Sequence, residues 1–224
     1  MRIPCPETVL MLSRRHFVRN AASAAAAALA APPLLAAESG PLTLTVTPET
    51  VLDNTDIVLP PPFDGDYPIP PRFQARIVPV VPGLQPNDIH IVTDSFHLYF
   101  ILPGDRAIRY GVAVGQEGLG WRGRATIGRK VEWPSWRPTE EMIARNPARY
   151  ERYRDGMPGG PGNPLGARAL YFYQGDRDTA IRVHGTTEPA SIGSRASNGC
   201  FRMYNSHVID LYRRVPLGAT AYAY

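Results

Sequence analysis

The chain carries the sequence His-Gly-Thr at residues 184–186 and the sequence Ser-Asn-Gly-Cys-Phe-Arg-Met at residues 197–203. His184 follows a predicted strand, and Cys200 lies 16 residues later, beyond a turn-rich loop that gives the chain room to return. A thiol with a pKa of about 8.5 is only a few per cent thiolate at neutral pH, and a nearby imidazole increases the reactive fraction by taking the proton. The spacing therefore fits a cysteine nucleophile with a histidine base.

The residues next to Cys200 support the same hypothesis. Gly199 permits a tight turn and a close approach of substrate, and backbone N–H groups at such a turn can stabilise an oxyanion. Arg202 can hold a substrate carboxylate through a bidentate pair. Residue chemistry alone leaves an alternative open, in which Cys200 is a buried, inert thiol and His184 has a structural role.

The two sequences resemble the catalytic motif of the L,D-transpeptidase family, also called the YkuD-type domain, in residue types, order and spacing. The resemblance covers about residues 77–224. Further segments similar to those of the family are Trp-Pro-Ser-Trp at 133–136, Asn-Pro-Leu-Gly at 163–166, Ile-Gly at 192–193, Asp-Leu-Tyr at 210–212 and a closing strand with Gly218 and Tyr222. Two positions depart from common forms: Asn198 stands where many members have histidine, and Phe201 where a smaller branched residue is frequent.

The resemblance implies a mostly β fold, a YkuD-like β sandwich or barrel with short peripheral helices and a lid loop at about residues 137–162. It also implies the chemistry. Cys200 attacks the bond between an L-centre, usually of diaminopimelate, and the terminal D-alanine of a peptidoglycan stem peptide. D-Alanine leaves, a thioester forms, and an amine on a second stem peptide converts the thioester into a cross-link. The resemblance further implies acylation by β-lactams of the carbapenem class.

The roles of the other site residues also follow from the resemblance. His184 would be the base, and Arg202 would position substrate. The remaining residues expected to line the substrate site are Ser197, Gly199, Gly185, Thr186, Asn198 and Tyr173. Tyr171 and Tyr173 lie on the preceding predicted strand, and we expect at least one of the two to pack in the core.

The N-terminus has the parts of a secretory signal. Arg14 and Arg15 precede an alanine-rich apolar run at residues 21–37, after which polar residues return. The paired arginines resemble a twin-arginine signal, which exports proteins already folded. A membrane span is disfavoured because the run is poor in Leu, Ile and Val and is interrupted by two prolines. We therefore expect residues 1–37 to be a cleaved signal, the protein to act in the periplasm, and no permanent membrane span.

Charge and cysteine content narrow the function classes. The net charge is +4 for the whole chain. Without residues 1–37, the chain has 20 basic and 19 acidic residues, so the basic pI gives little support for nucleic-acid binding. Cys5 leaves with the signal, and Cys200 then has no internal disulfide partner. A free thiol in an oxidising compartment is expected to be either buried or used.

The rest of the chain divides at about residue 74. Residues 38–73 are proline-rich, so we expect an extended lead-in or spacer with one short strand near residues 42–46. Residues 74–224 form the predicted catalytic domain. Strands are predicted at residues 75–81, 89–93, 97–102, 108–114, 125–133, 167–173, 179–184 and 219–224. Helices are predicted at residues 139–145 and 206–213, and the Gly- and Pro-rich segment 146–166 predicts no regular structure.

Three alternatives to cross-linking between stem peptides stay open. Water could resolve the thioester, which would give a carboxypeptidase or peptidase, or an amine of an exported protein could resolve it, which would attach that protein to the wall. From another class, the domain could be a non-catalytic wall-binding module, but the pairing of Cys200 with His184 argues against this. We expect neither a metal nor a cofactor, because one cysteine remains and no metal-ligand spacing is present among His90, His97, His184 and His207.

Overall fold

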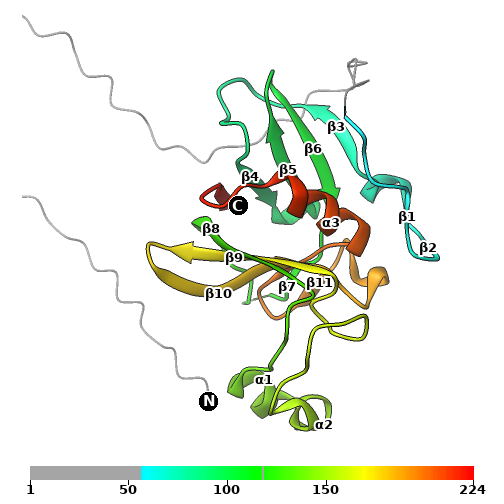
Figure 1. The fold of residues 1–224 in the computed structure, drawn as a ribbon, viewed down its shortest axis with the longest axis vertical. Coiled ribbons are helices and arrows are strands. Elements are labelled where there is room, and N and C mark those ends of the chain that lie inside the picture. The colour runs from blue at the N-terminus through cyan, green and yellow to red at the C-terminus, as the bar shows by residue number, and fades with distance from the viewer. Residues whose placement is uncertain (1–56, 118) are drawn as a thin grey trace, which may run out of the picture. The chain divides into compact units, whose positions relative to one another are not determined.

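The structure is a computed structural model that describes residues 57–117 and 119–224. The signal expected at residues 1–37 and the strand expected at residues 42–46 lie outside the described residues. A nine-stranded mixed sheet organises the described part of the chain, in the order β12-β10-β9-β8-β13-β4-β5-β6-β3 (Figure 1). Its strands are β3 (Arg76–Pro79), β4 (Ile89–Val92), β5 (His97–Leu102), β6 (Arg106–Gly111), β8 (Gly123–Glu132), β9 (Arg168–Gln174), β10 (Arg177–His184), β12 (Phe201–Arg202) and β13 (Thr220–Ala223). The pairs β10–β12 and β13–β4 are parallel, and the other pairs are antiparallel.

Short elements surround this sheet. Two small two-stranded sheets pair β1 (Phe63–Asp64) with β2 (Tyr67–Pro68), and β7 (Val114–Gly115) with β11 (Arg195–Ser197). The helices are α1 (Glu140–Arg145), α2 (Pro147–Tyr150) and α3 (Asn205–Arg214), with single 3₁₀ turns η1 (Pro71–Phe73), η2 (Thr93–Ser95), η3 (Glu151–Tyr153) and η4 (Pro189–Ser191). None of the helices in the described ranges is both long and apolar enough to cross a membrane.

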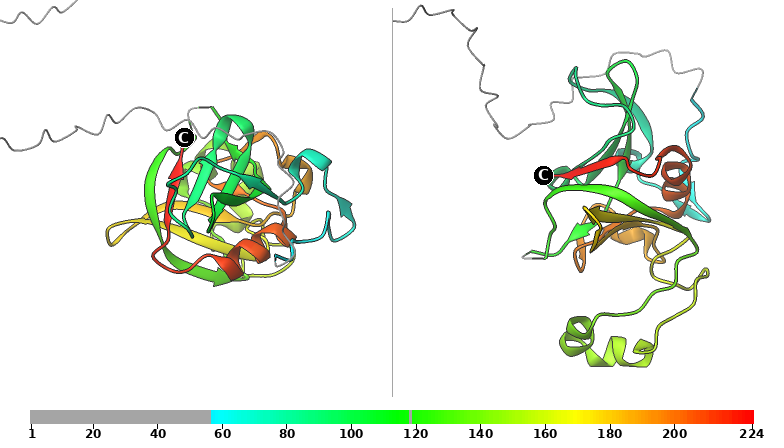
Figure 2. Two further views of the ribbon diagram at one scale, coloured as in Figure 1. Left: turned by 90° about the horizontal axis from the view of Figure 1, so that it is seen from above. Right: turned by 60° about the vertical axis from the view of Figure 1, so that its left-hand side comes forward.

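The main hydrophobic core lies between the two halves of the large sheet. β5 and β6 contribute Phe100 and Ile108, while β8 and β9 contribute Ile127 and Leu170, and all four side chains are buried. Figures 1 and 2 show the two groups of strands on either side of β13. Burying each such side chain stabilises the fold by about 1.5–3 kcal/mol. The predicted mostly β fold with short peripheral helices is confirmed.

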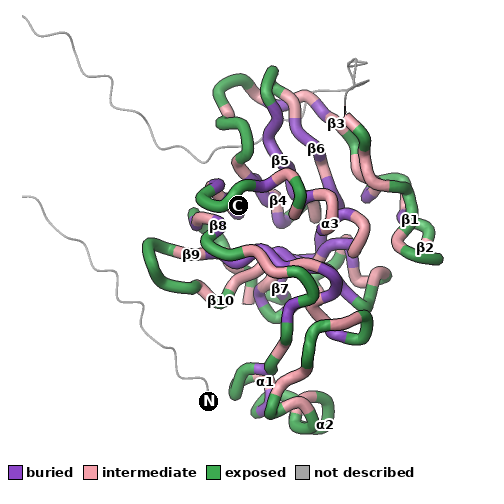
Figure 3. The backbone as a smooth tube through the Cα atoms, viewed as in Figure 1, coloured by how far each residue is buried: buried purple, intermediate pink, exposed green. Residues whose placement is uncertain are grey.

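β5 is almost entirely buried, and a tight turn joins it to β6. Five of its six residues are buried, which shows that both faces of this strand are covered (Figure 3). Gly104 and Asp105, which join β5 to β6, have φ values of 77° and 53°. Glycine adopts such left-handed backbone freely, and aspartate tolerates it better than most residues. The strand predicted at residues 97–102 is confirmed with the same bounds.

Two predicted elements need correction. Residues 108–114 were expected to be one strand, but β6 ends at Gly111 and β7 starts at Val114. Phe73 packs so closely on Gly111 that a Cβ added to this glycine would lie 2.6 Å from the Phe73 side chain. After Gly111 the chain leaves β5, and it then pairs with Arg202 and with β11. Residues 146–166 were expected to be irregular throughout, but their first part forms α2 and η3. Asn146 caps α2 by accepting from Arg149 N, and Pro147 occupies its first position.

α3 receives its N-terminal cap from a distant segment. Both oxygens of the Asp64 carboxylate accept hydrogen bonds from α3, one from Asn205 N at 3.0 Å and one from Ser206 N at 2.7 Å. Ile69 and Phe73 are buried in the same region. Residues 57–73, at the end of the predicted lead-in, thus pack on the domain. The Asp64 carboxylate satisfies two N–H groups of the helix, and its negative charge interacts favourably with the positive end of the helix dipole.

Asp64→Ala should lower the free energy of unfolding by about 1 kcal/mol, because a lost N-cap typically costs 0.5–2 kcal/mol. Urea unfolding of the purified protein measures this change. Asp66→Ala is the matched control, because Asp66 is an exposed carboxylate of the same hairpin. Equal stability of the two variants would contradict the capping role.

His207 on α3 is fully buried between the rings of Tyr110 and Tyr204, at centroid distances of 5.5 and 5.2 Å. Neither ring nitrogen has a hydrogen-bond partner among the described residues. Burial lowers the pKa of His207 from 6.5 to about 4, although the carboxylates of Asp64 and Asp210 act in the opposite direction. His207 is therefore neutral in the folded protein at neutral pH.

Because the unfolded chain binds this proton more tightly, the folded protein should lose stability as the pH falls from about 6.5 toward 4. Burial also lowers the pKa values of His90 and His184 to about 4, so both add to the loss. His207→Leu should reduce the slope in this window by up to about 1.4 kcal/mol per pH unit. Urea unfolding at several pH values measures it, and an unchanged slope would show that His207 is not the coupled group.

Candidate active site

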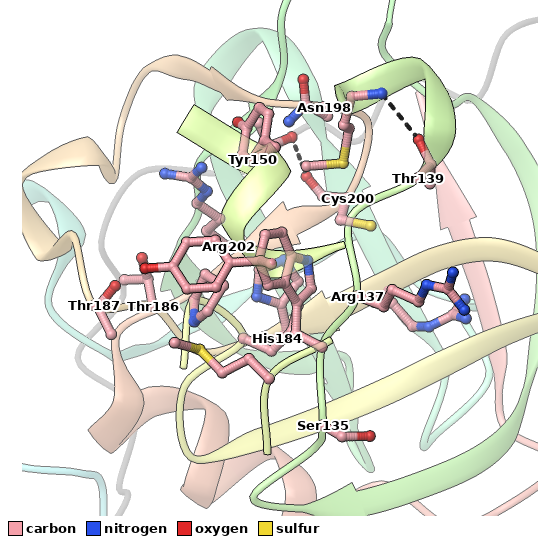
Figure 4. A pocket seen from close by; sticks show the side chains of 18 of the residues that line it. Ser135, Arg137, Thr139, Tyr150, His184, Thr186, Thr187, Asn198, Cys200 and Arg202 are labelled. Atoms are coloured by element: carbon pink, nitrogen blue, oxygen red, sulfur yellow. Dashed lines mark hydrogen bonds between the residues drawn. The ribbon is translucent and has the colours of Figure 1, made fainter. Parts of the chain in front are cut away.

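A cavity of about 520 Å³ lies between the sheet and a lid formed by residues 135–162. The sheet side is lined by Tyr171, Ala180, Arg182, His184, Thr186, Glu188, Ser197, Asn198, Cys200 and Arg202. The lid side is lined by Ser135, Trp136, Arg137, Thr139, Met142, Arg149, Tyr150, Arg152, Tyr153, Met157 and Gly162. Figure 4 shows Cys200, His184 and Arg202 together with the lid residues Arg137, Thr139 and Tyr150 around this pocket.

The parallel pairing of β12 with β10 brings the two halves of the sequence motif together. Val183 pairs with Phe201 and His184 with Arg202, and Met203 N donates to His184 O at 2.8 Å. This register places Cys200, the residue just before β12, in the same cavity as His184.

Burial and backbone contacts hold His184 as a neutral imidazole. Nδ1 lies 2.7 Å from the carbonyl oxygen of Gly185, which can only accept, so Nδ1 carries the proton and Nε2 does not. Burial lowers the pKa of His184 to about 4, and the charges of Arg202 and Arg182 lower it further, against hydrogen bonds to the backbone of Gly185 and Leu165. The arrangement suits a general base acting through Nε2.

Cys200 is partly accessible from the cavity, and its thiol points to a backbone carbonyl. Sγ lies 3.6 Å from Ala180 O, and within the described ranges no hydrogen bond joins Sγ to the imidazole. Burial raises the pKa of the Cys200 thiol, and the Arg182 backbone and the charges of Arg182 and Arg202 oppose this only in part. The resting pair is therefore a neutral thiol and a neutral imidazole, not a thiolate–imidazolium pair.

A bulge in β10 aims the Ala180 carbonyl at the thiol. The register of β10 against β9 shifts between Asp178 and Arg182, and Ala180 has a φ of 61°, which is unusual for a residue with a Cβ. Asp178 stabilises the bulge, because its Oδ1 accepts from Ala180 N at 2.8 Å. This bulge was not predicted from the sequence, because it contains no glycine.

Ser197 and Gly199 shape the turn before Cys200. The Ser197 hydroxyl hydrogen bonds to Cys200 O and accepts from Gly199 N at 3.2 Å. Gly199 has a φ of 122°, which favours glycine, and does not itself line the cavity. Because the Gly199 N–H already has this partner, it is not a free oxyanion donor in the resting site.

The other predicted residues are placed as follows. Thr186 lines the cavity, and its Oγ1 accepts from Glu188 N at 2.9 Å. Gly185 lies outside the lining, where an added Cβ would come within 2.2 Å of Asn205 Oδ1. Asn198 lines the cavity and accepts from Arg145 Nη1 of the lid at 2.8 Å.

Tyr173 does not line the cavity, whereas Tyr171 does. Tyr173 packs on Gly128, where an added Cβ would lie 2.5 Å from its ring. The register explains the difference: Tyr171 pairs with Arg182, two residues before His184, and Tyr173 pairs with Asp178 on the far side of the bulge. At least one of the two tyrosines was expected to pack in the core: Tyr171 is buried, at 8% exposure, although it also lines the cavity, whereas Tyr173 is half-buried.

Arginine contacts join the lid to the segment that follows Cys200. Arg202 Nη1 donates to Glu188 Oε2 at 2.7 Å, and Arg149 Nη2 of α2 donates to Glu188 Oε1 at 2.9 Å. Of these residues, Arg202 was predicted from the sequence, whereas Arg149, Arg182 and Glu188 were not. Arg182 could have been predicted, because side chains two residues apart on a strand lie on the same face and His184 follows it by two.

The lid is held together by its own contacts. Trp136 and Met157 exchange backbone hydrogen bonds of 2.9 and 2.7 Å at its base. The Trp136 ring packs against the rings of Tyr150 and Tyr153, at 6.2 and 5.8 Å. These contacts give the lid a defined shape that places its aromatic rings over the cavity.

The family model described as the L,D-transpeptidase catalytic domain (YkuD) matches residues 86–222. The chain therefore belongs to the L,D-transpeptidase catalytic-domain family. The matched residues include the whole lid and every residue that lines the cavity.

Individual relatives agree with this assignment. The chain is 36% identical over 134 residues to the ORF 5 product of the ATP synthase subunits region of Fuscovulum blasticum, described as a candidate L,D-transpeptidase, with 57% of this chain and 65% of that protein covered. It is 31% identical over 144 residues to the probable L,D-transpeptidase YbiS of Escherichia coli strain K12, with 62% and 45% covered. The match thus spans less than two thirds of the length of either relative.

Solved structures are also similar to the chain. A Brucella melitensis crystal structure described as a probable carnitine operon oxidoreductase is 54% identical, with 67% of this chain and 93% of that chain covered and a TM-score of 0.48. A cysteine-to-serine mutant of the Enterococcus faecium L,D-transpeptidase is 14% identical, with 63% and 50% covered and a TM-score of 0.48.

The neutral resting pair predicts a distinctive pH profile for alkylation of Cys200. Because burial raises the pKa of the thiol, reaction with iodoacetamide should accelerate only above about pH 8.5, the ordinary thiol pKa. The same protein unfolded in urea is the control, and the native apparent pKa should be the higher of the two. A fast plateau for the native protein at pH 5–7 would instead indicate a thiolate–imidazolium pair.

Proposed function

We propose that this protein is an exported peptidoglycan L,D-transpeptidase in which Cys200 is the nucleophile and His184 is the base. One observation carries the proposal: in a chain of the L,D-transpeptidase family, Cys200 and His184 line the same lidded cavity, and the Nδ1 contact with Gly185 O favours the tautomer in which Nε2 can accept a proton. Arg202, which lines this cavity beside the nucleophile, would position the substrate.

In the acylation step, Nε2 of His184 takes the thiol proton as Cys200 Sγ attacks the carbonyl carbon between an L-centre and the terminal D-alanine. The C–N bond of this peptide then breaks, and the imidazolium returns the proton to the leaving amine. D-Alanine departs, and the shortened stem peptide remains bound to Cys200 as a thioester. Before attack, the thiol must leave Ala180 O, its partner in the resting site.

In the transfer step, an amine of a second stem peptide attacks the thioester, the C–S bond breaks, and His184 relays the amine proton to the departing thiolate. The lid favours an amine over water as acceptor, because Trp136, Tyr150 and Tyr153 cover the cavity with apolar surface. Hydrolysis of the thioester and transfer to an exported protein use the same first step and are the alternatives.

We infer that the protein acts in the periplasm after export by the twin-arginine route. Arg14 and Arg15 before the alanine-rich run support this location. Residues 1–37, which carry this signal, lie outside the described part of the structure.

Cys200→Ala should abolish release of D-alanine from a tetrapeptide stem, and His184→Gln should lower kcat by about 10²–10⁴ with little change in substrate binding. Mass analysis of tetrapeptide muropeptides incubated with the enzyme measures both. His97→Gln is the control, because His97 lies on β5 and does not line the cavity. Continued release of D-alanine by the Cys200→Ala variant would contradict the role of Cys200 as the nucleophile.

The same mass analysis separates the three acceptors. Cross-linked dimers are the result expected from amine transfer, whereas trimmed monomers alone would identify a carboxypeptidase. Adducts formed only when an exported protein is added would identify an attachment enzyme. Either of the last two results would contradict the proposed acceptor and leave the acylation step in place.

A further inference from the structure

Five arginines line the cavity: Arg137, Arg149, Arg152, Arg182 and Arg202. Within the described ranges, Glu188 is the only acidic residue in the lining. Arg182 and Arg202 belong to the sheet side, where their charges act on Cys200, while the other three arginines belong to the lid. Arginines therefore line the cavity on both its sheet side and its lid side.

The ion pairs neutralise only part of this charge. Arg182 donates from Nη1 and Nη2 to the two carboxylate oxygens of Asp178, at 2.7 and 2.9 Å, so this pair is neutral. Arg149 and Arg202 share the single carboxylate of Glu188, at 2.9 and 2.7 Å, so this trio keeps one positive charge.

The two remaining lid arginines have no carboxylate partner among the described residues. The Arg152 guanidinium lies 4.7 Å from the centre of the Tyr153 ring, and within residues 57–117 and 119–224 no ion pair or hydrogen bond engages Arg137. Both side chains are exposed toward solvent. Counting the five arginines against Asp178 and Glu188, the cavity has an excess of three positive charges.

We propose that this cavity selects acyl donors with at least two free carboxylates, and that Arg137 and Arg152 of the lid bind them. The inference rests on the proposed function and names its substrate class: stem peptides whose carboxyl groups are free acids and not amides. A guanidinium binds a carboxylate through paired, charge-assisted hydrogen bonds, which a neutral carboxamide cannot match. Arg137 and Arg152 are thus specificity-determining residues, distinct from the residues that carry the reaction.

The test compares two synthetic tetrapeptides that differ only in amidation. One has free acids throughout; in the other, the carboxyl groups before the scissile bond are carboxamides and the terminal D-alanine carboxylate is kept. Native enzyme should show a kcat/KM about tenfold to hundredfold higher for the free acid, the range expected for charge-assisted hydrogen bonds, mainly through KM. In the double variant Arg137→Gln/Arg152→Gln, this preference should fall to about twofold or less.

Arg213→Gln is the matched control, because Arg213 is an exposed arginine on α3 that does not line the cavity. It should keep the native preference. An equal kcat/KM for the two peptides with native enzyme, or a preference that survives in the double variant, would overturn the inference.

Equilibrium binding of both peptides to Cys200→Ala protein keeps the inference separate from the proposed function. If native enzyme processes neither peptide, the proposed function fails. Tighter binding of the free-acid peptide, lost in a triple variant that adds the two lid substitutions, would still support charge selection. Equal dissociation constants for the two peptides would reject it.

Discussion

The short parallel pairing between β10 and β12 is the constraint on which the rest of the site depends. Two residue pairs set the register: Val183 and Phe201 are buried in the core on one face, while His184 and Arg202 line the cavity on the other. Because side chains alternate along a strand, a slip of one residue would exchange these faces. Packing of Phe201 against Phe172, at 6.2 Å between ring centres, thus helps to hold the segment that carries Cys200 in place. Phe201, which stands where a smaller branched residue is frequent in the family, therefore has a role in core packing.

The charges around this pairing account for the state of the reacting groups. Burial disfavours both the thiolate of Cys200 and the imidazolium of His184, and the neighbouring arginines lower both pKa values. The resting enzyme keeps its proton on sulfur, directed to Ala180 O. In the proposed mechanism, an arriving donor peptide would place a carbonyl beside Sγ, and proton transfer from the thiol to His184 would accompany the attack.

Sequence reasoning succeeded where local chemistry determines the structure and failed where distant contacts do. The strand at residues 97–102 was predicted because turn residues bound it on both sides, and the helix capped by Thr139 because its cap lies within one turn. The bulge at Ala180 depends on an Asp178 contact that no local pattern marks, and the Asp64 cap of α3 joins segments 141 residues apart. Tyr171 could not be told from Tyr173, because both face the same side of β9 and only the register of β10 separates them.

The central claim is that Cys200 becomes acylated by the shortened stem peptide. Native enzyme mixed with a tetrapeptide donor, with no acceptor peptide, and quenched in acid within milliseconds to seconds should hold this acyl group on sulfur. Peptide mapping by mass spectrometry should then find the donor mass, less D-alanine, on the fragment that contains Cys200. Release of D-alanine with no adduct at any time, or with an adduct on a different residue, would contradict the account.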